Sequence, residues 1–370
     1  MSSTQFSVKE AIAKLVASED LKSYEAEAAM EEIMAGKAAS SQIASFLTAI
    51  RMKGPTVDEL TAFATAMRRH AFSINPKITT RLVDTCGTGG DRFKTFNIST
   101  ISALITAGTG VSVAKHGNRS FTSKCGSADL LESLGVNISA DPLTVQSSIE
   151  NTGIGFMFAP VFHPAMKFVA STRKEIGIRT VFNVLGPLTN PAGAKSQVVG
   201  VYDSSLVLQI AQVLKKLGTE DAMVVHGMDG IDEISLAGRT HCARILGEEI
   251  REEILEPSSF GLKHKSLEEI SAEGAELEQY TLTAFNILSL DNSELTAKEC
   301  ATKEMMLMNS SAALVTTGIV DNYVDGVELA RSSVDSGKAF EKLTSLVKFT
   351  NGDSSRLESL RSVPKIERKN

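Results

Sequence analysis

Apolar residues recur at helical spacing along the N-terminal part of the chain. One helix face is marked by four of them at positions i, i+3, i+4 and i+7: Ile43, Phe46, Leu47 and Ile50. Gly54-Pro55 ends this helix, and a capping box from Thr56 to Glu59 begins the next one. No alternating strand pattern interrupts the region. We therefore predict a small all-helical N-terminal domain over residues 1–75.

Further along the chain, short apolar stretches alternate with helical patterns. The predicted strands lie at residues 82–83, 111–114, 156–159, 198–202 and 222–225. The helical pattern is clearest at 206–217 and ends at Gly218. This alternation predicts an α/β domain over 76–350, with a mostly parallel central sheet flanked by helices. The more polar segment 248–303 is expected at the edge of the sheet, and 351–370 is expected to be a flexible tail.

The bulk composition narrows the functional classes. The chain has 370 residues, of which 22% are charged, and a formal net charge of −6. A negative net charge does not indicate the overall basic surface that is typical of nucleic-acid-binding proteins. The four cysteines (Cys86, Cys125, Cys242 and Cys300) form no zinc-binding spacing, and we interpret them as reduced, mostly buried thiols. The sequence has neither a signal-peptide pattern nor a membrane-length apolar run, and it therefore predicts a cytoplasmic protein.

Two polar, glycine-containing turns each follow a predicted strand, GTGGD at 87–91 and KHGNR at 115–119. Because the carboxyl ends of parallel strands meet at one edge of a sheet, both turns are expected where α/β folds place their ligands. The glycines of GTGGD let backbone N–H groups converge on phosphate oxygens. The alternative explanation for these glycines is a tight turn whose backbone requires positive φ. Asp91 and the hydroxyl-rich run NIST at 97–100 favour a ligand with phosphates, hydroxyls and bound Mg²⁺.

The second turn concentrates hydrogen-bond donors around one glycine. Lys115 supplies a point charge for phosphate, and Asn118 can both donate and accept. Three hydroxyls extend this series of donors: Ser120, Thr122 and Ser123. A solvated loop is the alternative, although buried strands rarely end in this way without a polar ligand. Ser127 follows at the predicted start of a helix, where its hydroxyl can cap the helix or bind phosphate.

An acidic pair and a basic segment complete the candidate features. Asp232 and Glu233 follow a predicted buried strand, where adjacent carboxylates favour a Mg²⁺ site over a pair pointing apart on a surface loop. The basic segment contains four cations: Lys167, Arg173, Lys174 and Arg179. These cations could bind an anionic ligand or could simply form a solvated helix face. The sequence alone does not single out Arg173 among them. We interpret the following GPLTNP run and His163 as structural.

Six motifs occur in an order that resembles the anthranilate phosphoribosyltransferase family of tryptophan biosynthesis: GTGGD, NIST, KHGNR, GSAD, RxxxGxRTxFNxLGPLTNP and HGxDGxDE. The resemblance extends from about residue 10 to about residue 348. It implies transfer of the phosphoribosyl group from phosphoribosyl pyrophosphate to the amino group of anthranilate. It also implies that the helical domain, completed by a segment around 165–190, forms the contact of a homodimer.

The resemblance assigns two substrate sites residue by residue. It implies that phosphoribosyl pyrophosphate binds to Gly87, Gly90, Asp91, Thr95, Asn97, Ile98, Ser99, Thr100, Lys115, His116, Gly117, Asn118, Arg119, Ser120, Phe121, Thr122, Ser123 and Ser127. Gly87, Asn118 and Arg173 would contact anthranilate, with the Arg173 guanidinium matched to its carboxylate.

A magnesium site and one candidate catalytic residue are also implied. Ser99, Asp232 and Glu233 would hold Mg²⁺, with two ions per subunit. Because an aromatic amine is already neutral at pH 7, no general base is needed before it attacks the sugar. His116 is a candidate acceptor of the amine proton, and a packing or orienting role is the alternative.

The chain departs from the family pattern at several positions. Cys125 and Thr122 stand where serine is usual, and both are near-isosteric replacements. Phe168, Ser171 and Thr172 replace the commoner His, Pro and Val just before the cation expected to bind anthranilate. These three replacements bear on the access path of anthranilate rather than on the reaction.

Two other classes of protein are alternatives. A pyrimidine nucleoside phosphorylase resembles this fold, but its basic turn reads Lys-His-Ser-Thr-Gly-Gly, whereas Lys115-His116 here continues with Gly-Asn-Arg. A non-catalytic nucleic-acid-binding relative would show an extended basic face and would lose some substrate residues. The net charge of −6 and the retained motifs argue against it.

Overall fold

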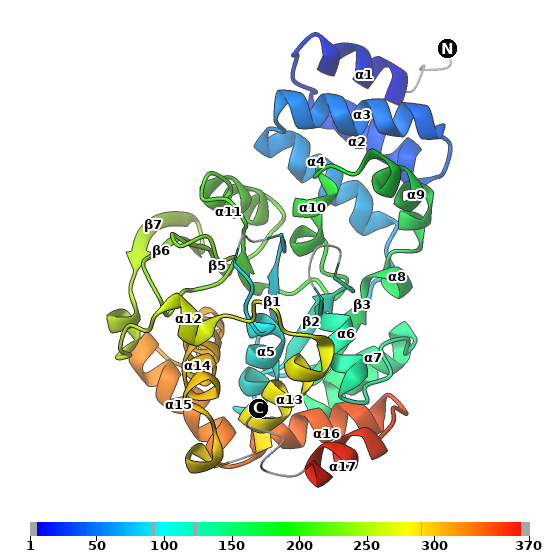
Figure 1. Cartoon of the computed structure of the whole chain (residues 1–370). Coiled ribbons are helices and arrows are strands. Elements are labelled where there is room, and N and C mark those ends of the chain that lie inside the picture. Colours follow the sequence, from blue (N-terminus) through cyan, green and yellow to red (C-terminus); the bar gives the residue numbers. More distant parts are fainter. Residues whose placement is uncertain (1–5, 91–92, 121–123, 290, 364–370) are drawn as a thin grey trace.

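The computed structural model describes residues 6–90, 93–120, 124–289 and 291–363 (Figure 1). A bundle of helices at the N-terminus lies beside a larger α/β part with a central sheet, and this confirms the predicted fold class. The bundle helices are α1 (Val8–Val16), α2 (Ser23–Met34), α3 (Ser40–Lys53) and α4 (Val57–Arg69). Among the described residues, no helix combines the length and apolar composition that crossing a bilayer requires.

The helical bundle is held together by one buried carboxylate as well as by apolar packing. The predicted capping box is present, since the Thr56 hydroxyl accepts the Glu59 N–H at 3.2 Å and Glu59 accepts the Thr56 N–H at 2.7 Å. The Glu59 side chain also accepts the Leu21 N–H at 2.9 Å and the Lys53 ammonium at 2.9 Å. Glu59 is fully buried and therefore connects α4 with α3 and with the α1–α2 loop.

The sheet has seven strands in the order β3-β2-β1-β4-β5-β6-β7. They are β1 (Val83–Gly87), β2 (Val113–Gly117), β3 (Ile154–Phe158), β4 (Ser196–Gly200), β5 (Asp221–Gly227), β6 (Thr240–Leu246) and β7 (Glu249–Leu255). Strands β1 to β5 pair in parallel, and β6 and β7 add an antiparallel hairpin at one edge. The hairpin lies partly in the segment expected at the sheet edge, but its strands are not among those predicted. Its outer strand carries exposed charges instead of an apolar run, a pattern that protects sheet edges from pairing.

Helices cover both faces of the sheet. The remaining helices are α5 (Ile98–Gly108), α6 (Ser127–Ser133), α7 (Pro142–Thr152), α8 (Ala159–Phe162), α9 (Lys167–Ile176), α10 (Phe182–Leu185), α11 (Leu206–Lys216), α12 (Leu267–Ile270), α13 (Leu277–Ser289), α14 (Ala297–Thr317), α15 (Tyr323–Asp335), α16 (Lys338–Phe349) and α17 (Ser355–Ser362), with 3₁₀ turns at Pro164–Met166, Gly186–Leu188, Pro257–Phe260 and Asn292–Glu294. Neighbouring strand residues alternate between two cores: Val198 packs with α5 and α14, whereas Val199 packs with α11 and the helical bundle.

The helical bundle also packs against a segment that lies far from it in the chain. Helix α9 packs on α2 and α3, and α10 packs on α4. Val169, Val181 and Phe182 are buried in the same apolar cluster as the bundle residues. In Figure 1 α9 and α10 lie next to α4, between the bundle and the sheet.

The C-terminal segment differs from the flexible tail expected from residue 351. Helix α17 forms there and buries Leu357, and the Asp353 N–H donates to the Gly135 carbonyl at 2.8 Å. The Arg361 guanidinium lies over the Phe340 ring at 5.2 Å. One apolar side chain and a few specific contacts are enough to anchor this helix, and a polar composition does not reveal them. Residues 364–370 lie outside the described part of the chain.

The buried position of Glu59 yields a stability prediction. Glu59→Ala leaves the Leu21 and Thr56 backbone N–H groups without their acceptor. It also leaves the Lys53 ammonium with Asp20 as its remaining carboxylate partner, so the free energy of unfolding should fall by about 3 kcal/mol. Urea denaturation followed by circular dichroism measures the change. Glu19→Ala, at an exposed position of the same domain, is the control and should change the value by less than about 0.5 kcal/mol. Equal denaturation midpoints for the two variants would contradict this account.

Candidate active site

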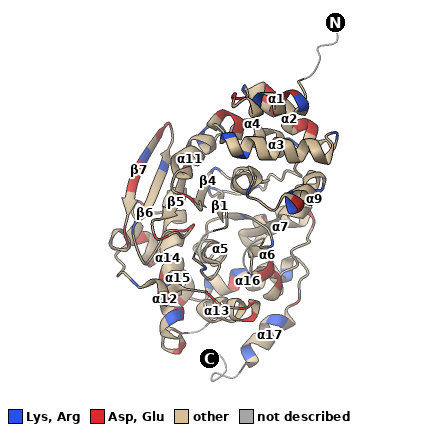
Figure 2. Cartoon of the chain, turned by 45° about the horizontal axis from the view of Figure 1, so that its top comes forward, with Lys and Arg blue, Asp and Glu red and all other residues tan. Residues whose placement is uncertain are grey.

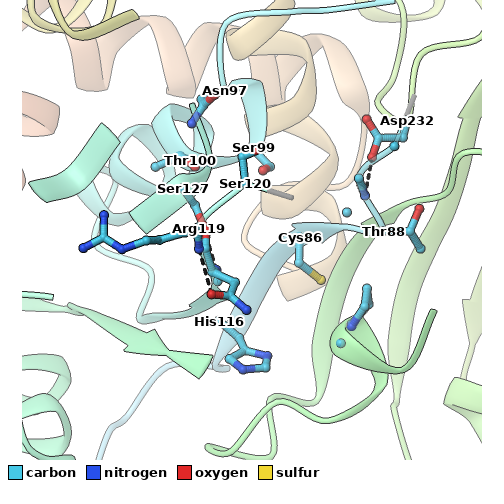
Figure 3. Close-up of a pocket in the computed structure, with 18 of the residues that line it drawn as sticks. Cys86, Thr88, Asn97, Ser99, Thr100, His116, Arg119, Ser120, Ser127 and Asp232 are labelled. Atoms are coloured by element: carbon cyan, nitrogen blue, oxygen red, sulfur yellow. Dashed lines mark hydrogen bonds between the residues drawn. The ribbon is translucent and has the colours of Figure 1, made fainter. Parts of the chain in front are cut away.

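A cavity of about 350 Å³ opens at the carboxyl ends of β1 and β2. Its lining includes every predicted site residue that the structure describes: Gly87, Gly90, Thr95, Asn97, Ile98, Ser99, Thr100, Lys115, His116, Gly117, Asn118, Arg119, Ser120, Ser127, Arg173, Asp232 and Glu233. Figure 3 shows Arg119 and Ser127 on one side and Thr88 and Asp232 on the other. Asp91, Phe121, Thr122 and Ser123 lie outside the described residues.

The first glycine turn, residues 87–90, follows β1 and is fastened to the acidic loop. The Thr88 N–H donates to the Gly200 carbonyl and the Gly89 N–H donates to Asp232 Oδ2, both at 2.9 Å. A Cβ at Gly87 would lie 2.9 Å from the same carboxylate oxygen, and Gly90 has a φ of +80°. The turn therefore needs glycine for close approach as well as for its backbone conformation.

The NIST run forms the N-terminus of α5 at the cavity wall. Asn97 adopts a left-handed conformation with a φ of +42° and precedes the first helical residue. The Ser99 N–H donates to Glu233 Oε1 at 3.1 Å, so the second acidic residue satisfies one of the free N–H groups of this helix start. The positive end of the α5 dipole is thus directed at the region where phosphate is expected.

Lys115 brings a buried ammonium group to the floor of the cavity. Its Nζ donates to the Thr85 carbonyl at 2.6 Å and to the Ser99 hydroxyl at 3.4 Å. Burial lowers the pKa of Lys115, while the nearby charge of Asp84 acts in the opposite direction. An ammonium group held in this way can stabilise negative charge that develops above it.

Asp84 lies fully buried on β1 beneath this cation, and burial raises its pKa. It accepts the His116 N–H at 3.2 Å and the Asn190 side-chain amide at 2.7 Å. Asn190 also donates to the Ala114 carbonyl at 2.9 Å. The Asn of the GPLTNP run thus braces β1 against β2, which agrees with the structural role expected for that run.

His116 is held as a neutral imidazole. Burial, together with the nearby His163 ring at a centroid distance of 5.0 Å, lowers the pKa of His116 to about 3, although a backbone hydrogen bond with Gly186 opposes the shift. Its Nε2 atom has no hydrogen-bond partner among the described residues. A group with this pKa is a weak proton acceptor near pH 7. The geometry therefore favours the packing or orienting alternative over proton transfer.

The second turn is braced by the start of α6. Ser127 Oγ accepts the Asn118 N–H and donates to the Asn118 carbonyl, both at 3.2 Å. Arg119 instead pairs with Asp129 at 2.8 Å and Glu132 at 2.7 Å, and Figure 3 shows its side chain extending away from the other labelled residues. Arg119 lines the cavity, but its guanidinium is already engaged by two carboxylates.

Arg173 is the cation that the sequence could not single out. Arg173 lines the cavity, its guanidinium lies 5.2 Å from the centroid of the Phe182 ring, and burial lowers its pKa. Among the described residues it has no carboxylate partner. A partly desolvated guanidinium that lines a cavity and pairs with no carboxylate of the described residues suits a carboxylate ligand.

The family departures before Arg173 have separate surroundings. A Cβ at Gly36 would lie 2.7 Å from the Phe168 ring, so Phe168 packs against the helical bundle. Ser171 is exposed. The buried Thr172 hydroxyl has no hydrogen-bond partner among the described residues. None of the three belongs to the cavity lining.

Sequence reasoning assigned no ligand role to several further residues of the lining, among them Arg179 and Tyr280. Arg179 donates to the Gly90 carbonyl and lies over the Tyr202 ring at 4.3 Å. Tyr280, at the start of α13, packs against Phe96 at 5.2 Å. Arg179 is one of four cations in the basic segment and the second arginine of the RxxxGxRTxFNxLGPLTNP motif, but neither pattern assigned it a role, and Tyr280 lies in a stretch without any motif.

The acidic pair fits a magnesium site that is completed by other ligands. Asp232 and Glu233 are both buried and lie close to the first turn and to Ser99. The described residues contain no cluster of three or more His, Cys, Asp or Glu side chains suited to a metal. Two carboxylates and a hydroxyl are hard oxygen donors, and Mg²⁺ commonly takes its remaining ligands from water and substrate phosphates.

Comparisons with known proteins agree with this geometry. The α/β domain model of a glycosyl transferase family matches residues 79–340, and its helical bundle domain matches residues 9–71. An anthranilate phosphoribosyltransferase of Methanocorpusculum labreanum is 46% identical over 345 residues, which cover 93% of this chain and 98% of the relative. One of Acetivibrio thermocellus is 47% identical, with 93% and 97% covered.

Solved structures give the same result. The anthranilate phosphoribosyltransferase of Thermus thermophilus superposes with a TM-score of 0.84 at 38% identity, covering 92% of this chain and 99% of that one. The Saccharomyces cerevisiae enzyme in complex with PRPP and Mg has a TM-score of 0.84 at 27% identity, with 93% and 98% covered. The chain therefore belongs to the anthranilate phosphoribosyltransferase family.

Proposed function

We propose that this protein transfers the 5-phosphoribosyl group from phosphoribosyl pyrophosphate to the amino group of anthranilate and releases pyrophosphate, in tryptophan biosynthesis. The observation that carries the proposal is Arg173, a partly buried guanidinium without an acidic partner among the described residues, in one cavity with the two glycine turns. Its relatives bear the name of this activity at 44–47% identity over nearly their full length.

The site offers distinct surroundings for the two substrates. The phosphates of phosphoribosyl pyrophosphate would bind between the first turn, the α5 N-terminus and Lys115, where the helix dipole and the ammonium group supply positive charge. Anthranilate would place its carboxylate at Arg173 and would lie near Asn118 and Gly87.

Ser99, Asp232 and Glu233 would hold Mg²⁺, and we propose two ions per subunit. When bound, Mg²⁺ supplies positive charge to the pyrophosphate oxygens. In the reaction, the amine nitrogen forms a bond to ribose C1 while the C1–O bond breaks, and the electron pair leaves with pyrophosphate. Lys115 and the α5 N-terminus would stabilise the negative charge on the leaving group. The amine proton becomes acidic only as the new bond forms, so most of the acceleration comes from alignment and leaving-group stabilisation.

The two alternative functions have less support. A pyrimidine nucleoside phosphorylase would need the Lys-His-Ser-Thr-Gly-Gly turn that this chain lacks. For a nucleic-acid-binding relative we expected an extended basic face, but basic and acidic residues are interspersed along the helices in Figure 2.

We also propose a cytoplasmic homodimer formed through the helical domain. This domain would comprise residues 1–75 with the segment around 165–190, and the catalytic domain would comprise 76–350. The bundle exposes the large apolar side chains Val16, Tyr24 and Met52, which a second subunit could cover.

The reaction and the role of Arg173 can be tested together. The purified protein should remove anthranilate fluorescence only when anthranilate, phosphoribosyl pyrophosphate and Mg²⁺ are all present. Arg173→Ala should raise the KM for anthranilate about tenfold to 100-fold, because it removes a charge-assisted contact with the carboxylate. Lys174→Ala, an exposed neighbour outside the cavity, is the matched control and should behave as the wild type. A wild-type protein that binds phosphoribosyl pyrophosphate but leaves the fluorescence unchanged would point to another acceptor.

The acidic pair can be tested by a Mg²⁺ titration of activity. The double variant Asp232→Asn with Glu233→Gln keeps oxygen acceptors for the Gly89 and Ser99 N–H groups but removes both charges. We expect the Mg²⁺ concentration for half-maximal activity to rise about tenfold or more, with an unchanged melting temperature in the absence of substrates. An unshifted titration curve would remove both residues from the metal site.

The depressed pKa of His116 predicts a pH dependence of stability. Between about pH 6.5 and 3 the unfolded chain binds a proton at this residue and the folded chain does not, so the free energy of unfolding falls on acidification by up to about 1.4 kcal/mol per pH unit. His116→Gln should therefore show a shallower loss of stability than the wild type in denaturation experiments from pH 6.5 to 4.5. Parallel curves would mean that the imidazole is protonated in the folded protein.

A further inference from the structure

The first glycine turn is fastened at three successive residues. Thr88 donates to the Gly200 carbonyl and Gly89 donates to Asp232, each at 2.9 Å. The third contact involves a carbonyl instead of an N–H group, because the Gly90 carbonyl accepts a hydrogen bond from the Arg179 guanidinium. The turn is thus held by two backbone N–H groups at its start and by one charged side chain at its end.

Arg179 is closely fitted between this turn and an aromatic ring. Its guanidinium lies 4.3 Å from the centroid of the Tyr202 ring, and the Tyr202 N–H donates to the Thr88 hydroxyl at 3.0 Å. A Cβ at Gly90 would lie 2.8 Å from Arg179 Nη2, and the φ of +80° at Gly90 disfavours any other residue, so glycine suits this arrangement. A planar guanidinium can stack on the ring and donate to the carbonyl at the same time, which a lysine ammonium cannot do equally well.

Arg179, which makes the third contact, lies in a different part of the fold from the partners of Thr88 and Gly89. Gly200 is the last residue of β4 and Asp232 lies in the loop after β5, whereas Arg179 lies on the connection between α9 and α10. These two helices pack on the helical bundle, α9 against α2 and α3 and α10 against α4. The same α9–α10 region carries Arg173, the cation proposed to bind the acceptor carboxylate. Arg179 is therefore a direct link between the bundle side of the cavity and the turn proposed to bind phosphate.

We propose that Arg179 is a positioning residue, which holds the Gly90 end of the first turn against the bundle side and so arranges the turn for phosphoribosyl pyrophosphate before the substrate binds. The substrate named here rests on the proposed function, whereas the fastening of the turn does not. Fixing the turn in advance lowers the conformational entropy that binding must remove, so the effect appears in substrate affinity. Chemistry at saturating substrate then depends little on Arg179.

The test compares Arg179→Ala, Arg179→Lys and the control Lys174→Ala. Amide hydrogen exchange of the peptide covering residues 85–90 is measured in the ligand-free protein. Binding of phosphoribosyl pyrophosphate with Mg²⁺ is measured by calorimetry, and KM and kcat come from the fluorescence assay. We expect faster exchange in this peptide for Arg179→Ala, an affinity loss of about tenfold, and a change in kcat of less than about threefold. Arg179→Lys should be intermediate and Lys174→Ala unchanged.

The other outcomes overturn the inference in distinct ways. Lost affinity with unchanged exchange in the ligand-free protein would mean that Arg179 contacts the substrate directly. Lost kcat with an unchanged KM would place Arg179 in the chemical step. Wild-type values in every assay would show that the contact with Gly90 has no role. If the wild-type protein does not bind phosphoribosyl pyrophosphate, the proposed function fails, and the exchange experiment still decides whether Arg179 fastens the turn.

Discussion

The parallel pairing of β1 with both β2 and β4 is the constraint on which the site depends. The register places Gly87 opposite Gly200, so β1 and β4 end together, and the turn after β2 leaves the same edge of the sheet. Gly200 also leaves no room for a Cβ, because the backbone of Asp232 lies against it. Loops that are more than a hundred residues apart in the chain therefore meet within hydrogen-bond distance. One shifted register would separate the acidic pair from the glycine turn.

The second constraint is electrostatic. Lys115 and Arg173 are cations in partly desolvated positions, where burial lowers the pKa of each. Such groups cost folding free energy when no anion compensates them. Asp84 compensates Lys115 from within the sheet, and Asn190 holds that carboxylate in place. Arg173 has no comparable acidic partner among the described residues, and the unmet charge is available to an acidic ligand. The site is thus arranged for anions before any anion binds.

The helical bundle contributes to the site as a support. It packs on α9 and α10, which carry Arg173 and border Arg179, so the acceptor side of the cavity depends on contacts made outside it. Phe168 belongs to this support through its contact with Gly36. Phe168 therefore affects the packing of α9 on the bundle more directly than it affects the cavity lining.

The sequence by itself determined the elements and the chemistry of the turns, because these depend on local signals. Helical spacing and the Thr56–Glu59 capping box are properties of neighbouring residues, and they predicted the bundle. Apolar runs followed by glycine turns predicted the parallel strands and the ligand edge. The order of the six motifs indicated the family.

The tertiary structure decided what depends on distant partners. Only folding separates Arg173 from Lys167 and Lys174, since its burial and its place in the cavity lining distinguish it and its positive charge does not. Only folding shows that His116 is too buried to take up a proton near pH 7. Folding also pairs Arg119 with Asp129 and Glu132, and it places the Arg179 guanidinium where it donates a hydrogen bond to the Gly90 carbonyl. Packing between residues that are distant in the chain sets the charge state, the exposure and the partner of each of these side chains. The order of residue types along the sequence does not reveal them.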